Sequence, residues 1–287
     1  MRHGTTTARR RPGRRGAALG ALVVAATVVL AACSDGTDGP AEPGPTAAPT
    51  SAGPELSGHL SVFAAASLQG VFDDLATTFE ERHPSVTVDP ITYDGSSTLA
   101  TQLVEGASAD VLATADEKNM TTVADAGLVQ GAPRVFTTNT LQVVVPAGNP
   151  EGVTSLADLA TLASSGGTVV LCAPEVPCGS AAHKALDAAG VTFTPASEEQ
   201  NVKAVLTKVQ TGDADAGIVY RTDVLAAGPD VDGVDFPEAA SAVNAYPIAV
   251  LAEPARTHDE AVAQAFVDLV MSDEGQRVLA SHGFVAP

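Results

Sequence analysis

Apolar and polar residues follow one another in segments whose periodicity predicts strands alternating with helices. A short, almost wholly apolar run at 60–66 predicts a buried strand. In the segment 68–83 that follows, apolar residues recur at the spacing of a helix with one buried face. These residues are Leu68, Val71, Phe72, Leu75 and Phe79.

The same alternation continues to the end of the chain. Strands are predicted at 86–93, 110–114, 141–146, 168–172, 216–220 and 246–251. Helical segments are predicted at 97–105, from 117, at 155–159, at 180–189, at 202–209 and at 260–271. This order predicts an α/β fold with mostly parallel sheets flanked by helices. Ligands of such folds bind at the carboxyl ends of strands, near helix N-termini.

The N-terminal segment has the pattern of an export signal. Residues 1–16 are polar and rich in arginine, and residues 17–32 are uninterruptedly small and apolar. Sixteen residues are fewer than the roughly 20 that span a bilayer, so we predict a signal peptide at 1–32. Arg14-Arg15 suits either general or twin-arginine export.

The end of this signal resembles the lipobox of bacterial lipoproteins. Leu30-Ala31-Ala32 precedes Cys33, the position at which such proteins are lipidated after cleavage. Residues 33–55 are then a lipidated cysteine followed by a polar, proline-rich segment that predicts a flexible tether. We therefore expect an extracytoplasmic protein that is lipid-anchored to the outer face of the cell membrane. The alternative is a plain signal peptide with an incidental cysteine.

Charge excludes one class of partner. All six basic residues of the first 33 belong to the export signal, which leaves nine basic residues against 34 acidic ones from residue 34 onward. The formal charge of this part is therefore −25. Such a surface repels nucleic acid, so we predict no nucleic-acid partner.

The remaining cysteines form a close pair. Cys172 and Cys178 lie six residues apart, and outside the cytoplasm such a pair predicts a disulfide. Two free, half-buried thiols are the alternative. A zinc site is not indicated, because no matching cysteine or histidine spacing accompanies the pair.

Several strand ends lead into helices through small or polar residues. Five such positions are singled out, the loops at 66–68, 95–98, 177–180 and 198–202 and the strand end at Tyr220, and the four loops contain Ser67, Ser96, Cys178 and Val202. Helix N-termini carry unpaired backbone N–H groups and partial positive charge, so such loops can bind an oxyanion without a formal cation. Each position by itself also has a plain structural explanation, Ser67 as the N-cap of the helix predicted at 68 and Tyr220 as the edge of a core.

Five sequence blocks together resemble the periplasmic molybdate-binding proteins of ABC transporters. The blocks occur in order at 62–68, 93–100, 108–116, 174–179 and 217–223, and the resemblance runs from about Gly58 to Val285. It implies a two-lobed clamshell of the type II binding-protein fold. Lobe 1 would comprise 56–138 plus 241–287, and lobe 2 would comprise 139–240.

The resemblance also assigns roles to the five positions. Ser67 and Ser96 would give hydroxyls and backbone N–H groups, and Tyr220 would give its phenol hydroxyl. Cys178 and Val202 would give backbone N–H groups, although Cys178 is larger than the usual small residue. The ligand would be molybdate or tungstate, held as an oxyanion with no direct ligand to the metal and no cofactor.

The implied function is capture of this oxyanion for the permease and ATPase of an ABC importer, by a protein that we expect to be monomeric. A site for another tetrahedral oxyanion, such as sulfate or phosphate, is the alternative. An enzyme is not expected, because Ser67 lacks the Gly-x-Ser-x-Gly context and the histidines follow no catalytic or metal spacing. An adhesive lipoprotein is a further alternative, against which the ordered blocks argue.

Overall fold

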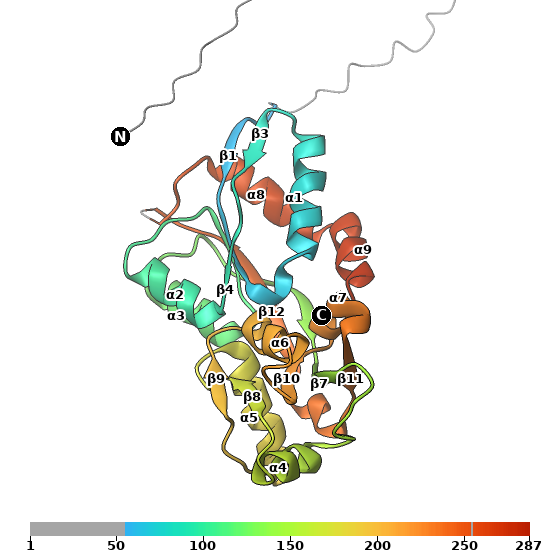
Figure 1. Cartoon of the computed structure of the whole chain (residues 1–287). Coiled ribbons are helices and arrows are strands. Elements are labelled where there is room, and N and C mark those ends of the chain that lie inside the picture. The colour runs from blue at the N-terminus through green and yellow to red at the C-terminus, as the bar shows by residue number, and fades with distance from the viewer. Residues whose placement is uncertain (1–54, 254) are drawn as a thin grey trace, which may run out of the picture. The chain divides into compact units, whose positions relative to one another are not determined.

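The structure is a computed structural model that describes residues 55–253 and 255–287 (Figure 1). The predicted signal peptide, Cys33 and the tether up to residue 54 lie outside the described residues. Among the residues that are described, no helix combines the length and the apolar character needed to cross a bilayer.

Two five-stranded sheets form the framework, which confirms the α/β, two-lobed fold class. The first sheet has the order β4-β2-β5-β12-β6 and the second β11-β7-β10-β8-β9, while β1 and β3 pair separately. The first sheet and the separate pair comprise β1 (Gly58–Leu60), β2 (Val62–Ala65), β3 (Val86–Val88), β4 (Thr92–Asp94), β5 (Val111–Ala113), β6 (Arg134–Asn139) and β12 (Asn244–Val250). The second comprises β7 (Leu141–Pro146), β8 (Val169–Cys172), β9 (Ser197–Glu199), β10 (Ala216–Tyr220) and β11 (Val231–Val234).

Helices pack on each sheet to complete two lobes. The first lobe contains η1 (Ala66–Leu68), α1 (Val71–Arg82), α2 (Ser96–Val104), α3 (Glu117–Asp125), α8 (Glu260–Met271) and α9 (Asp273–Ser281). The second contains α4 (Leu156–Ser164), α5 (Pro177–Ala189), α6 (Val202–Gln210), α7 (Arg221–Ala227), η2 (Gly228–Asp230) and η3 (Pro237–Ser241).

Each sheet has one reversed strand, and both reversed strands follow a passage between the lobes. In the first sheet β12 is antiparallel to both of its neighbours, and in the second sheet β7 is. The other four strands of each sheet share one direction, as the expectation of mostly parallel sheets requires. A strand that enters from the other lobe begins where the parallel strands end, so it must run the opposite way.

Several predicted element boundaries are wrong, three of them for clear local reasons. The run predicted as one strand at 60–66 divides at Ser61 into β1 and β2, which join different sheets. The strand predicted at 86–93 divides into β3 and β4, which join different sheets on either side of Pro90, a residue without an N–H to donate. Helix α1 begins at Val71 rather than at 68, because Gly70 interrupts the turn with φ of 89°. Helix α5 begins at Pro177 rather than at 180, with proline in the first turn, where its missing N–H costs nothing.

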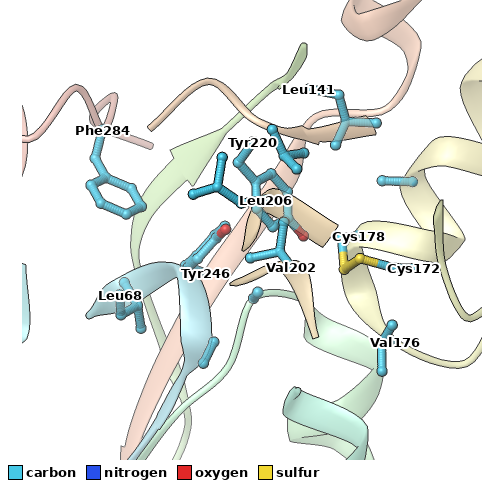
Figure 2. Close-up of a cluster of buried hydrophobic side chains, with 14 of the residues drawn as sticks. Leu68, Leu141, Cys172, Val176, Cys178, Val202, Leu206, Tyr220, Tyr246 and Phe284 are labelled. Carbon is cyan, nitrogen blue, oxygen red and sulfur yellow. A yellow bond between two sulfur atoms is a disulfide. The ribbon is translucent and has the colours of Figure 1, made fainter. Parts of the chain in front are cut away.

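The core of the first lobe reaches the junction with the second. Phe72 packs against Phe136 and Phe266, each at 5.9 Å between ring centroids. Tyr246 of β12 then contacts Phe136 and Tyr220, the last residue of β10 in the second sheet. Aromatic packing is therefore continuous from one lobe to the other. Figure 2 shows Tyr220 and Tyr246 at this junction, close to Val202 and Cys178.

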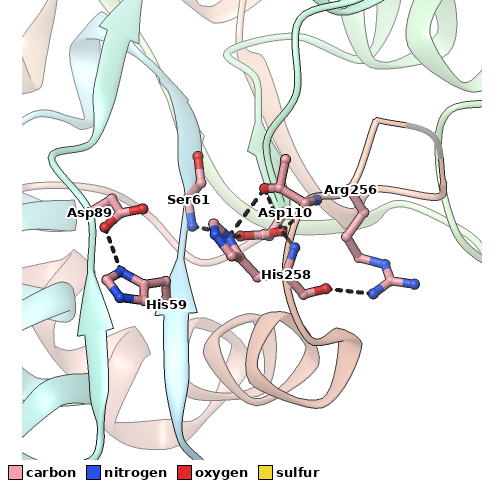
Figure 3. A network of polar contacts seen from close by, with 7 residues as sticks. His59, Ser61, Asp89, Asp110, Arg256 and His258 are labelled. Atoms are coloured by element: carbon pink, nitrogen blue, oxygen red, sulfur yellow. Dashed lines mark hydrogen bonds and ion pairs between the residues drawn. The ribbon is translucent and has the colours of Figure 1, made fainter.

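A buried carboxylate fixes the loop that precedes α8 (Figure 3). Asp110 Oδ1 accepts from the backbone N–H of His258 at 2.7 Å. Asp110 Oδ2 accepts from the backbone N–H of Ser61 at 2.7 Å and lies 2.7 Å from Nδ1 of the His258 ring. Burial by itself raises the pKa of Asp110, but these hydrogen bonds outweigh it and hold the pKa below its ordinary value. The carboxylate therefore stays charged and ties the loop to β1 and β5.

Candidate functional site

A small cavity lies where strand ends and helix starts of both lobes meet. Its volume is about 10 Å³. The lining residues are Ala65, Ala66, Ser67, Asp94, Gly95, Ser96, Ala115, Val176, Pro177, Cys178, Asn201, Val202 and Tyr220. All five residues singled out from the sequence are among them, so the fold brings together positions that are up to 153 residues apart.

Backbone N–H groups face the cavity region from three helix starts. Ser96 is the first residue of α2, Cys178 the second residue of α5, and Val202 the first residue of α6. The first N–H groups of a helix have no acceptor within that helix, and they lie at its positive end. Together they form an anion-binding arrangement contributed by both lobes.

Ser67 reaches the cavity in a different way from the one predicted. It lies in the short turn η1 after β2, so it does not cap α1, whose N-cap is Gly70. The buried Ser67 hydroxyl instead shares a hydrogen bond of 3.0 Å with the Tyr246 hydroxyl. This contact fixes the Ser67 side chain at the cavity wall.

Ser96 and Tyr220 each accept a hydrogen bond from the protein. The backbone N–H of Ala115 donates to Ser96 Oγ at 2.9 Å, and Asn244 Nδ2 donates to Tyr220 Oη at 3.0 Å. Burial, with Tyr246 and Asp116 nearby, holds the pKa of the Tyr220 phenol well above its ordinary value. Tyr220 therefore remains protonated and able to donate at any physiological pH.

The cysteine pair stands behind one wall of the cavity. Cys172, the last residue of β8, and Cys178 in α5 are joined by a disulfide. Only the backbone of Cys178 is needed as a donor, so the disulfide is compatible with the role implied for this position. It also ties the start of α5 to the end of its neighbouring strand.

A polar contact joins the lobes at the rim of the cavity. Asn201 Nδ2 donates to Asp94 Oδ1 at 3.0 Å, while Asn201 Oδ1 accepts from the Ala204 N–H and so caps α6. Gly95 packs so closely that an added Cβ would lie 2.1 Å from the Gln200 carbonyl oxygen. Asp94 and Gly95 lie in the block at 93–100, whereas Gln200 and Asn201 lie outside the five blocks, and no role was predicted for any of them.

Three further residues near the site were missed by sequence reasoning altogether. They are Asn139, Asn244 and Tyr246, which lie at or next to the two passages between the lobes. Asn244 donates to the Tyr220 hydroxyl, Tyr246 shares a hydrogen bond with the Ser67 hydroxyl, and Asn139 donates to the Tyr246 hydroxyl. Asparagine and tyrosine at strand ends have no distinctive spacing, so no sequence signal marks them. Only the pairing of β6 with β12 places them together.

The electrostatics of the site depend on neutral donors. None of the residues that line the cavity is Lys, Arg or His. Lys203 of α6 follows the lining residue Val202 in the chain, and its Nζ lies 2.9 Å from Oδ1 of the buried Asp223. Burial raises the pKa of Asp223, and the charge of Lys203 opposes that rise. Lys203 therefore forms an ion pair with Asp223.

A metal-ion site is not indicated in the part of the chain that the structure describes. No group of three or more His, Cys, Asp or Glu side chains there is arranged to hold a cation. The cavity donors are hydroxyl and N–H groups, which suit an anion.

Comparison with known proteins identifies the family of the chain. Residues 60–285 match the bacterial extracellular solute-binding protein family. A Mycobacterium bovis protein named molybdate-binding protein ModA is 45% identical over 258 residues, which cover 90% of this chain and 93% of that protein. This match confirms the resemblance seen in the sequence blocks.

Solved structures show the same fold. The periplasmic molybdate-binding protein of Azotobacter vinelandii aligns with a TM-score of 0.65 and 21% identity, covering 79% of this chain and 99% of that one. The sulfate-binding protein SubI of Mycobacterium tuberculosis aligns with a TM-score of 0.67 and 20% identity, covering 79% and 86%. The chain belongs to the bacterial extracellular solute-binding protein family.

Proposed function

We propose that this protein captures molybdate or tungstate outside the cytoplasm and delivers it to an ABC importer. One observation carries the proposal: neutral donors from five separate segments of two lobes line a single small cavity. These are the hydroxyls of Ser67, Ser96 and Tyr220 and the backbone N–H groups at Cys178 and Val202. The 45% identity to a protein named for molybdate binding supports the choice of ligand.

The donor set favours a fully deprotonated oxyanion. Each of these groups can offer a hydrogen to an anion, whereas the one lining carboxylate, Asp94, already accepts from the Gly95 N–H and from Asn201. A ligand that keeps a proton, such as hydrogen phosphate, would need an acceptor in the cavity. Molybdate, tungstate and sulfate need none, and a rigid cavity separates them by size.

The two lobes give a mechanism for capture and release. We propose that lobe 1 comprises 56–138 plus 241–287 and lobe 2 comprises 139–240, with passages at Thr140 and before Asn244. An anion that contacts donors of both lobes stabilises their closed arrangement, because it binds that arrangement more tightly than an open one. The permease and ATPase would receive the anion when the lobes separate.

We also propose that the protein acts as a monomeric lipoprotein. The lipobox at 30–33 and the polar segment up to residue 55 support an anchor and a tether. The role is binding, since the chain belongs to a solute-binding family. No catalytic step or cofactor enters this proposal.

A comparison of thermal melts tests the ligand. The purified mature protein is melted with molybdate, tungstate, sulfate or phosphate at equal concentration, with a dye or a calorimeter as readout because the chain has no tryptophan. A ligand at 1,000 times its dissociation constant stabilises by about 4 kcal/mol, which raises the melting temperature by several degrees. We expect large shifts with molybdate and tungstate only.

The other outcomes are equally clear. A larger shift with sulfate or phosphate would keep the binding-protein fold and replace the ligand. No shift with any of the four oxyanions would contradict the proposed function.

A further inference from the structure

The two strands that connect the lobes each carry a buried asparagine at the passage. Asn139 ends β6, Asn244 begins β12, and the two residues are paired directly in the sheet. Asn139 Nδ2 donates to Thr222 Oγ1 at 2.8 Å and lies 3.4 Å from Tyr246 Oη. Asn244 Nδ2 donates to Tyr220 Oη and to the carbonyl oxygen of Ala115.

The orientation of the Asn244 amide follows from its partners. The Ala115 carbonyl oxygen, 2.7 Å away, can only accept a hydrogen bond, so the side-chain atom facing it must be the nitrogen. That nitrogen has a second hydrogen, and Tyr220 Oη lies 3.0 Å from it. Tyr220 therefore accepts from Asn244, and its own proton is free to point elsewhere.

One residue, Ala115, connects Asn244 to Ser96 through its two backbone polar groups. The Ala115 N–H donates to Ser96 Oγ at 2.9 Å, while its carbonyl oxygen accepts from Asn244. A chain of hydrogen bonds thus runs from Tyr220 of the second lobe to Ser96 of the first. At both ends the hydroxyl accepts from the protein, so each keeps its own proton to donate, Ser96 toward the cavity and Tyr220 toward the cavity or the neighbouring Tyr246 hydroxyl.

We infer that Asn244 is a positioning residue that makes Tyr220 a dedicated hydrogen-bond donor to the bound oxyanion. The inference rests on the proposed function. Asn244 is not among the residues that line the cavity, and it acts through the Tyr220 hydroxyl and the Ala115 carbonyl group. It sets the selectivity of the site for anions that carry no proton, because a hydroxyl that already accepts from Asn244 does not turn to accept from hydrogen phosphate.

The position of Asn244 also relates selectivity to lobe closure. Asn244 and Ala115 belong to the first lobe, whereas Tyr220 belongs to the second. The hydrogen bond that orients Tyr220 therefore forms only when the lobes are in the arrangement described here. Strand β12, which begins at Asn244, therefore carries the residue that orients the Tyr220 hydroxyl when the lobes come together.

A double-mutant cycle tests the inference. Molybdate affinity is measured by calorimetry on the purified mature protein for wild type, Asn244→Ala, Tyr220→Phe and the combined variant. Loss of one orienting hydrogen bond should weaken binding by about tenfold in Asn244→Ala. In the Tyr220→Phe background the same substitution should change affinity by less than about twofold, because the oriented hydroxyl is gone.

Two further variants separate positioning from general damage. Asn244→Leu fills the space, keeps water from replacing the amide, and should reproduce the loss seen with alanine. Asn119→Ala removes an asparagine of similar burial, 6% exposed against 7%, whose amide bonds to Asp116 rather than to a site hydroxyl. It should leave molybdate affinity unchanged even if it lowers the melting temperature.

Selectivity provides the second readout. The ratio of molybdate to hydrogen phosphate affinity, obtained by competition, should fall in both Asn244 variants. Equal weakening of every anion, or the same loss with and without the Tyr220 hydroxyl, would overturn the inference and leave the proposed function intact. A wild-type protein that binds no oxyanion would overturn the proposed function and the inference with it.

Discussion

At the scale of single residues, the site depends on hydroxyl groups whose other hydrogen bonds are already made. Ser96 accepts from Ala115, Tyr220 accepts from Asn244, and Ser67 shares a bond with Tyr246. Groups held in this way need little reordering when an anion arrives. A dehydrated anion in a cavity without formal cations depends on every one of them.

Removing one hydroxyl should therefore weaken binding strongly. We expect Ser67→Ala and Tyr220→Phe each to reduce molybdate affinity at least about tenfold, since a charge-assisted hydrogen bond contributes roughly 1.5–3 kcal/mol. Calorimetric titration measures this directly. Tyr93→Phe is the control, because the Tyr93 hydroxyl donates to Asp73 at 2.8 Å and does not line the cavity. Wild-type affinity in both site variants would refute the assignment of these donors.

At the scale of elements, two glycines allow backbone segments to approach closely, Gly95 between the lobes and Gly179 within the second lobe. Gly95 precedes α2 and faces Gln200 and Val176 of the other lobe. Gly179 lies within α5, and an added Cβ would meet the Ala173 carbonyl oxygen of the same lobe at 1.9 Å. One glycine therefore permits lobe closure, whereas the other permits folding within a lobe.

Alanine at these two positions should have contrasting effects. Gly95 has φ of −60° and ψ of 136°, so Gly95→Ala is compatible with its own backbone and conflicts only with the opposite lobe. We expect it to lower molybdate affinity by more than about tenfold while the ligand-free melting temperature stays near wild type. Gly179→Ala should lower that melting temperature instead.

Calorimetry and thermal melts of the two variants, with and without molybdate, make the comparison. If Gly95→Ala binds molybdate as the wild type does, close approach of the lobes at this point is not needed for capture. If Gly179→Ala melts as the wild type does, the backbone contact within the second lobe can relax without cost.

At the scale of the whole molecule, charge and anchoring act together. The chain from residue 34 onward has a formal charge of −25, so the anionic surface of a membrane repels it. Electrostatic attraction therefore does not hold the protein at a membrane surface. A lipid on Cys33 would supply the attachment, and the polar segment that follows would let the folded part reach the importer.

Substitution of Cys33 should release the protein. We expect the wild type in the membrane fraction and Cys33→Ser in the medium or the soluble fraction, at low and at high salt alike, because no electrostatic attraction remains. Immunoblots of the fractions measure this, and Cys178→Ser is the control for general effects of losing a cysteine. Retention of Cys33→Ser at the membrane would contradict the lipid anchor.

Much of the fold and the site could be predicted from the sequence. The strands at 141–146 and 216–220 and the helix at 260–271 have the bounds that their periodicity predicts. The loops with Ser67, Ser96, Cys178, Val202 and Tyr220 were identified because residue type and strand-to-helix transitions are local features. The ordered blocks added the expectation that these loops converge.

What the sequence by itself determined is therefore the class of fold, the surplus of acidic charge and the small or polar residues at each strand-to-helix loop. These properties depend on residues that are neighbours in the chain or on composition, so they can be read from the sequence without knowledge of the fold. The tertiary structure alone decided which groups orient those donors. Asn244, Tyr246 and Ala115 act across the passages between lobes, and hydrogen bonds between residues so distant along the chain exist only after the sheets have formed.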